Sequence, residues 1–113
     1  MTPIEMAKLV RTYFYTSVDD KEMVNLLLGN LLMVMQNHSE VLDDESLLQI
    51  FLTLHITRFG TREMYTTVDY LISIRLPEII KDSKMTNKIY FTALKSGLMS
   101  QSIMLQLARH VTT

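Results

Sequence analysis

An apolar run from Met23 to Met35, in which ten of thirteen residues are Leu, Met or Val, is the feature that most constrains this chain. The run falls short of the roughly 20 residues that a membrane-spanning helix needs, and Asn25, Gly29 and Asn30 interrupt it. A helix built from this run is apolar nearly all round, and such a helix is buried by neighbours on most sides. We therefore expect it at the centre of the core, with no segment of the chain in a membrane.

Turn-forming residues are scarce, since the 113 residues include 3 Gly and 2 Pro. Average usage would give roughly eight and six in this length. A sandwich or barrel needs special backbone angles at each turn, so the scarcity favours helices joined by short loops. The length suits one domain. We predict a single all-α domain over residues 1–113, folded as a compact bundle or orthogonal array of five or six helices.

Capping patterns predict where the first three helices begin and end. Thr2-Pro3-Ile4-Glu5 has a hydroxyl cap, a proline at the first helical position and a glutamate three residues after the cap, which predicts a helix to about Tyr15. Ser17, followed by acidic residues, predicts the start of the second helix, which contains the apolar run. Asp43-Asp44-Glu45 predicts the start of the third helix, and Gly60 its end.

The second half of the chain continues in the same way. Thr61-Arg62-Glu63 predicts a cap for a fourth helix, although Tyr65 to Leu76 is rich in β-branched residues that also suit a strand. No second clear strand is available for pairing, so we interpret this segment as helix. Pro77 predicts its end or a kink, with a short helical turn from Glu78 to Lys81. The last two helices are expected over Thr86–Lys95 and Ser100–His110.

Sequence motifs for catalysis are absent. The chain has no glycine-rich phosphate loop, no nucleophile elbow and no cysteine. His38, His55 and His110 share no metal-ligand spacing, and we interpret each as a loop, surface or hydrogen-bonded core residue. We therefore expect a protein that is not an enzyme and that has no cofactor or metal. The lack of cysteine permits a reducing compartment, the N-terminus lacks signal-peptide features, and we expect a cytoplasmic protein.

The formal net charge of −1 conceals an asymmetry between the two halves. Residues 1–57 hold three basic and eight acidic side chains, whereas residues 58–113 hold eight basic and four acidic ones. From Lys81 onward, five basic groups face only Asp82. The halves can neutralise each other in the fold, and the alternative is an anionic partner for the basic end.

Methionine is unusually frequent, with nine in the chain. Flexible thioethers adapt to varied partners and line helix-binding grooves, although they also fill a core in place of leucine. We predict a small adaptor, regulator or inhibitor that acts through protein–protein interaction, using an apolar, Met-rich helix face or groove. Its partner is an unidentified protein or a second copy in a homodimer.

The segment from Ala93 to Ile103 resembles the helix-turn-helix core of phage-repressor-type DNA-binding proteins. It has a small residue in the first helix, Gly97 four residues later, and then Gln-Ser-Ile at the start of the second helix. The resemblance implies an alternative function, a DNA-binding regulator that uses residues 86–110 and dimerises through its N-terminal helices. Thr92 and Gln106 depart from the family, which has apolar residues at these places. The DNA-contacting residues that the resemblance implies are Gln101 and Ser102 toward bases and Lys88, Lys95 and Arg109 toward phosphates.

Overall fold

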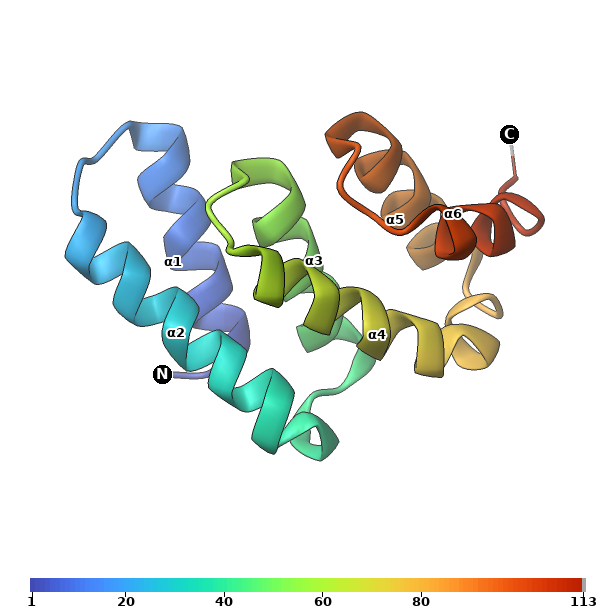
Figure 1. Ribbon diagram of the computed structural model, residues 1–113, viewed down its shortest axis with the longest axis horizontal. Coiled ribbons are helices and arrows are strands. Elements are labelled where there is room, and N and C mark those ends of the chain that lie inside the picture. The colour runs from blue at the N-terminus through green and yellow to red at the C-terminus, as the bar shows by residue number, and fades with distance from the viewer. Residues whose placement is uncertain (113) are drawn as a thin grey trace.

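The computed structural model describes residues 1–112, which form six α-helices and a short 3-10 helix, without a strand. The elements are α1 (Pro3–Thr16), α2 (Lys21–Asn37), η1 (Ser39–Val41), α3 (Asp44–Thr57), α4 (Arg62–Ile79), α5 (Ser83–Ser96) and α6 (Gln101–Ala108). Figure 1 shows α1 and α2 at one end of the molecule, α3 and α4 in the middle, and α5 and α6 at the other end. The predicted all-α fold class is confirmed.

Three helices begin at the caps that the sequence predicts. Thr2 and Glu5 form a complete capping box at the start of α1, in which each side chain accepts a hydrogen bond from the backbone N–H of the other residue. Asp43 caps α3 and Thr61 caps α4 through side-chain oxygens. Each cap satisfies a backbone N–H group that the helix itself leaves without a partner.

The predicted start of the second helix is wrong. Ser17 ends α1 in a left-handed conformation with φ 57°, and Asp20 caps α2 by accepting the N–H of Met23 at 3.1 Å. Ser, Asp and Asp occur within four residues here, and each is a good cap, so the residue pattern alone did not select among them.

The predicted end of the third helix is also wrong. α3 stops at Thr57, and Arg58 takes the left-handed position with φ 61° instead of Gly60. Gly60 serves a different need, because a β-carbon there would lie 2.8 Å from a methyl group of Leu54. The glycine therefore allows the loop to pass close to α3.

The segment from Tyr65 to Leu76 is helical, as interpreted, but α4 continues through Pro77 to Ile79. A proline this close to the C-terminal end of a helix removes only one late hydrogen bond, so the separate turn predicted after it does not form. The last two helices differ from their predicted limits by a few residues, since α5 begins at Ser83 after the Asp82 cap and α6 covers only Gln101–Ala108.

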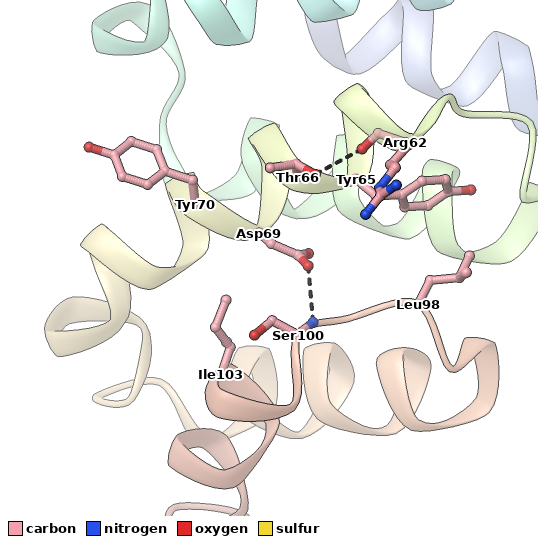
Figure 2. A pocket seen from close by; sticks show the side chains of 8 residues that line it. All are labelled: Arg62, Tyr65, Thr66, Asp69, Tyr70, Leu98, Ser100 and Ile103. Carbon is pink, nitrogen blue, oxygen red and sulfur yellow. Dashed lines mark hydrogen bonds between the residues drawn. The ribbon is translucent and has the colours of Figure 1, made fainter.

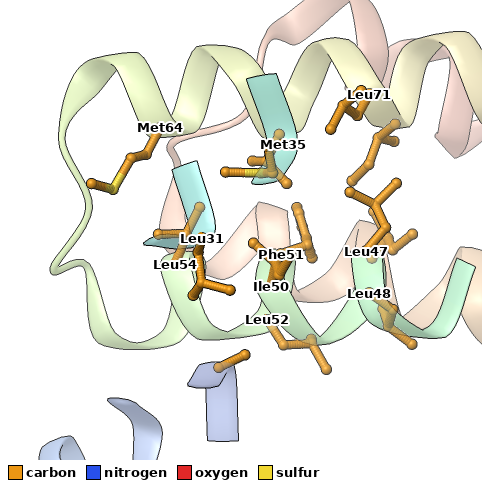
Figure 3. Packing of buried hydrophobic residues seen from close by; sticks show 14 of the residues in the cluster. Leu31, Met35, Leu47, Leu48, Ile50, Phe51, Leu52, Leu54, Met64 and Leu71 are labelled. Atoms are coloured by element: carbon orange, nitrogen blue, oxygen red, sulfur yellow. The ribbon is translucent and has the colours of Figure 1, made fainter. Parts of the chain in front are cut away.

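The central helix is α3. Ten of its fourteen residues are buried, and it contacts α1, α4 and α5. Figure 3 shows Ile50 and Phe51 of α3 among side chains from neighbouring helices, with Met35 of α2 and Leu71 of α4 close by. Ile50 and Phe51 have no exposed surface, so α3 rather than α2 organises the core.

The prediction that the Met23–Met35 helix is central is therefore wrong. α2 lies at the edge of the molecule against α1 and α4, and it buries only Leu27, Leu28, Leu31 and Met35. Its opposite side leaves Met23, Leu26 and Met33 exposed at 36%, 59% and 53%. A helix that is apolar all round thus has only one side covered within this chain.

None of the helices in residues 1–112 combines the length and the apolar character that crossing a membrane requires.

Candidate functional site

The turn between α5 and α6 has the backbone that the helix-turn-helix resemblance implies. Gly97 ends α5 with φ 72°, and its N–H donates to the carbonyl of Ala93 at 2.9 Å. A side chain at this φ would be strained although the space around Gly97 is open, so the turn favours glycine for its backbone.

The five residues proposed for DNA contact are all exposed. Lys88 and Lys95 lie seven residues apart on one face of α5. Gln101 and Ser102 are the first two residues of α6, and Arg109 follows its last residue. The structure therefore separates Gln101 and Ser102 from Arg109 by the length of α6. Gln101 also lines a cavity that α6 shares with α5.

A carboxylate already occupies the start of α6. Oδ2 of Asp69, on α4, accepts the N–H of Ser100 at 3.2 Å (Figure 2). Asp69 is buried, with 8% of its surface exposed. This negative charge lies at the positive end of the α6 dipole, where a DNA-reading helix would meet phosphates. Asp69 therefore stabilises α6 in the fold and opposes an anion at that end.

His55 of α3 connects Asp69 to the end of α5 in a buried polar cluster. Its Nδ1 lies 2.7 Å from Oγ of Ser96, and its Nε2 lies 3.8 Å from Oδ1 of Asp69. The His55 side chain has no exposed surface. The second distance is too long for a hydrogen bond, and neither Nε2 nor Oδ1 finds another hydrogen-bond partner within residues 1–112. We call His55, Asp69 and Ser96 the buried polar cluster.

Ser, His and Asp are the residue types of a nucleophilic triad, but the geometry of this cluster differs from that of a catalytic site. The Ser96 hydroxyl is buried and has three close polar contacts: the carbonyl of Ala93 at 3.1 Å, the N–H of Leu98 at 3.3 Å, and His55. A nucleophile must instead present its oxygen to a substrate. This geometry suits a connection between α3, α4 and the α5–α6 turn.

Tyr65 extends the polar cluster toward the end of α3. Its hydroxyl donates to the carbonyl of Leu54 at 2.7 Å, and its ring lies edge-on to the imidazole of His55, with ring centres 5.3 Å apart. Burial raises the pKa of the Tyr65 phenol. The phenol therefore stays protonated, as its donated hydrogen bond requires.

The sequence did not reveal this cluster. His55 is the hydrogen-bonded core histidine among the three, whereas His38 and His110 are exposed. His55 and Ser96 are 41 residues apart in the chain, and no spacing rule relates them. The position of His55 among the apolar residues Phe51, Leu52, Leu54 and Ile56 was the signal for a core histidine, and it did not indicate the partners.

A cavity of about 630 Å³ opens between α4 and the α5–α6 turn. Figure 2 shows Asp69 and Ser100 joined across it. Its walls are formed by Arg62, Tyr65, Thr66, Asp69, Tyr70, Leu98, Ser100 and Ile103. Two of the lining residues, Asp69 and Ser100, form the hydrogen bond that joins α4 to the start of α6, so this cavity borders the contact between these helices.

A second cavity, of about 390 Å³, forms a groove between α5 and α6, which we call the α5–α6 groove. One wall is formed by Tyr90, Ala93 and Leu94 of α5 and its cap residue Gly97, and the other by Met99 of the turn and Gln101, Met104, Leu105 and Ala108 of α6. None of these residues is charged. Leu94 and Leu105 are exposed at 57% and 62%, so the groove presents apolar surface to solvent.

The two walls of this groove share one spacing. The lining residues of α5 fall at i, i+3, i+4 and i+7 from Tyr90, and those of α6 fall at the same intervals from Gln101. This spacing forms one face of a helix, so two such faces border a single channel.

In residues 1–112, no three His, Asp or Glu side chains gather in a way that could hold a metal ion. Comparisons with family models, with curated proteins and with solved structures find no match to this chain.

Proposed function

We propose that this chain is a non-catalytic interaction protein, an adaptor, regulator or inhibitor, that binds an amphipathic helix of a partner protein in the α5–α6 groove. The observation that carries the proposal is the pair of uncharged walls with i, i+3, i+4, i+7 spacing. A partner helix with apolar residues at matching intervals would bury the exposed Leu94 and Leu105 and the partly exposed, flexible Met104, and would pack over Met99, which is already buried.

The net positive charge of the C-terminal segment that holds the groove supports an acidic partner. Residues 83–112 contain Lys84, Lys88, Lys95 and Arg109 and no Asp or Glu. The three lysines are exposed and recur on one face of α5, on the side of the helix turned away from the residues that line the groove, so their charge acts on a partner at longer range. Complementary charge raises the association rate and selects the partner, whereas the apolar groove supplies most of the affinity.

The absence of catalysis and the cytoplasmic location belong to the same proposal. The buried Ser96 hydroxyl and its contacts with backbone groups support a structural cluster over a nucleophilic one. A chain without cysteine is suited to a reducing compartment, where disulfides are rare.

The test uses a labelled peptide of about 16 residues, or four helical turns, with leucines at groove-facing positions and glutamates on its flanks. Fluorescence anisotropy should show saturable binding to the wild-type chain, and weaker binding for a control peptide in which lysines replace the glutamates. Leu94→Lys should weaken binding about tenfold or more, because a charge is costly to bury in an apolar contact. The matched control is Ile74→Lys, at an exposed apolar residue of α4 outside the groove, which should bind as the wild type does.

Equal binding by wild type and Leu94→Lys would contradict the proposal. So would the absence of any saturable binding by the acidic peptide.

The second candidate function is the helix-turn-helix regulator. The observation in its favour is the left-handed Gly97 followed by exposed Gln101 and Ser102 at the start of α6. Duplex DNA binding at low and moderate salt tests it, since a groove reader must show salt-dependent affinity. In that case, replacing Lys88 and Lys95 by alanine would weaken binding to all sequences, and Gln101→Ala would change the preferred sequence. We expect no sequence-selective DNA binding, because the Asp69 carboxylate lies at the start of α6.

A further inference from the structure

The residues of α2 are apolar on nearly all sides, but the fold buries only one side of this helix and leaves the other exposed. We define the outer face of α2 as Met23, Leu26, Gly29, Asn30 and Met33, all of which are exposed. These residues recur at intervals of three and four, which places them along one side of the helix. No charged residue occurs from Met23 to Asn37. Four helical turns of a surface helix are therefore uncharged.

The glycine at the middle of this face is not required by packing within residues 1–112. A β-carbon at Gly29 would meet nothing within 4 Å, so packing in the monomer would accept alanine. Glycine inside a helix costs about 1 kcal/mol relative to alanine. What Gly29 provides is a flat place where another helix can approach closely.

We propose that the outer face of α2 is a homodimer interface, in which it packs antiparallel against the outer face of α2 in a second copy of this chain. A second copy meets this face without opposing like charges, because the face has none. Asn30 suits a symmetric contact, since its amide both donates and accepts hydrogen bonds. In a two-fold dimer, the same patch of each copy must be complementary to itself, and this face meets that condition.

The sequence along α2 also selects the direction of pairing. A two-fold axis between Gly29 and Asn30 places Leu26 of each copy opposite Met33 of the other, so the two large apolar side chains pack together twice. A parallel pair would bring together the acidic residues Asp19, Asp20 and Glu22 near the start of both helices. It would also align the two helix dipoles, whereas an antiparallel pair opposes them.

The small contact area of this dimer predicts a weak association. A single helix face buries less surface than the total of about 1,600 Å² found in interfaces of standard size. The dimer should therefore form at micromolar or higher protein concentrations and dissociate on dilution.

Sedimentation velocity over a concentration series tests the association. The wild-type chain should shift from monomer to dimer as its concentration rises. Leu26→Lys places two cations in the interface and should abolish the shift, and Leu26 is exposed enough for the monomer to keep its fold, which circular dichroism checks. The matched control is Thr12→Lys, at an exposed residue of α1, which should dimerise as the wild type does.

Disulfide crosslinking tests the register, because the chain has no cysteine of its own. Asn30→Cys lies near the proposed axis, so its thiol meets the same thiol of the second copy and should crosslink about tenfold faster than Thr12→Cys under mild oxidation. Leu26→Cys should crosslink slowly, because the two thiols lie about seven residues, or 10 Å, apart along the antiparallel pair. Equally fast crosslinking at both α2 positions would show a parallel pair and contradict the proposed geometry.

A chain that stays monomeric at every concentration would overturn the proposal and leave this face to a different protein. The result is independent of the proposed function, because Leu26→Lys should bind the acidic peptide as the wild type does. Loss of peptide binding with an intact dimer would instead contradict only the α5–α6 groove.

Discussion

The imidazole of His55 lies where three helices and a turn meet. The ring contacts Ser96 at the end of α5. It also faces Asp69, whose carboxylate accepts the N–H of Ser100 at the start of α6. Arg58 also donates to the carbonyl of Ser96, and Thr86 donates to the carbonyl of Ile79. Together with these contacts, the cluster helps to position the groove proposed to bind a partner. At the residue scale, stability and function thus depend on the same buried polar groups.

Asp69→Ala should destabilise the fold by about 1 to 3 kcal/mol, because it leaves the Ser100 N–H without its acceptor and removes the carboxylate that faces the buried His55 ring. Glu78→Ala on the same helix is the control, since Glu78 and Lys81 form an exposed ion pair. Urea unfolding measures both variants. Equal losses would mean that the buried polar cluster contributes nothing beyond a surface charge.

Stability should fall in acid through the carboxylate cap of α3. Hydrogen bonds from Ser46, from its side chain and its backbone N–H, hold the pKa of Asp43 below its usual value. A lowered folded-state pKa contributes stability that is present above the unfolded pKa of about 4 and is lost as the pH falls through the folded pKa.

Asp43→Asn keeps an acceptor oxygen without the titration, so its melting temperature should fall less than that of the wild type between pH 6 and pH 2. Parallel pH profiles for the two proteins would exclude Asp43 as a source of acid sensitivity. Glu5 at the start of α1 also has a lowered pKa, from its hydrogen bonds with Thr2, and should account for part of the loss that remains.

At the scale of the elements, local chemistry predicted more than burial did. Thr2, Asp43 and Thr61 cap their helices because the signal is contained within four residues. The order of the helices in space is a long-range property. The apolar content of α2 predicted a central position for it. Both α2 and α3 are rich in apolar residues, and the sequence pattern does not indicate which of the two is surrounded by the other helices.

The candidate site divides in the same way. The glycine turn after α5 could be read from the sequence, because Gly97 meets a local backbone need. The association of His55 with Ser96 and Asp69 depends on how three helices pack, so residue order could not predict it. Likewise, nine methionines indicated an adaptable apolar surface, and only the fold shows that Met104 is partly exposed in the α5–α6 groove, that Met99 lines the groove although it is buried, and that Met35 and Met64 are buried away from it.

The neighbouring residues Leu26 and Leu27 test the position of α2 directly. Leu27 is 4% exposed and Leu26 is 59% exposed. Leu27→Asp should prevent folding, since a lone buried charge costs several kcal/mol. Leu26→Asp should melt within a few degrees of the wild type by circular dichroism. If both variants unfold, α2 is covered on both sides, as its composition predicts.

At the scale of the whole molecule, two uncharged apolar surfaces lie at opposite ends of a structure 39 Å long, with α3 and α4 between them (Figure 1). The outer face of α2 belongs to the acidic half of the chain, and the α5–α6 groove belongs to the basic half. A dimer through α2 would therefore present two grooves, one at each far end. Two linked sites bind a multivalent partner more tightly than either site alone.

Nuclear magnetic resonance of ¹³C-methyl-labelled methionine tests the central claim most directly, because the nine methionines report on the groove, on α2 and on the core in one spectrum. Titration with the acidic amphipathic peptide should shift the signals of Met104 and Met99, which line the groove, while those of Met6 and Met35, which are buried away from it, stay in place. Duplex DNA at physiological salt should shift none of them. Unmoved Met99 and Met104 signals at saturating peptide would contradict binding in the α5–α6 groove.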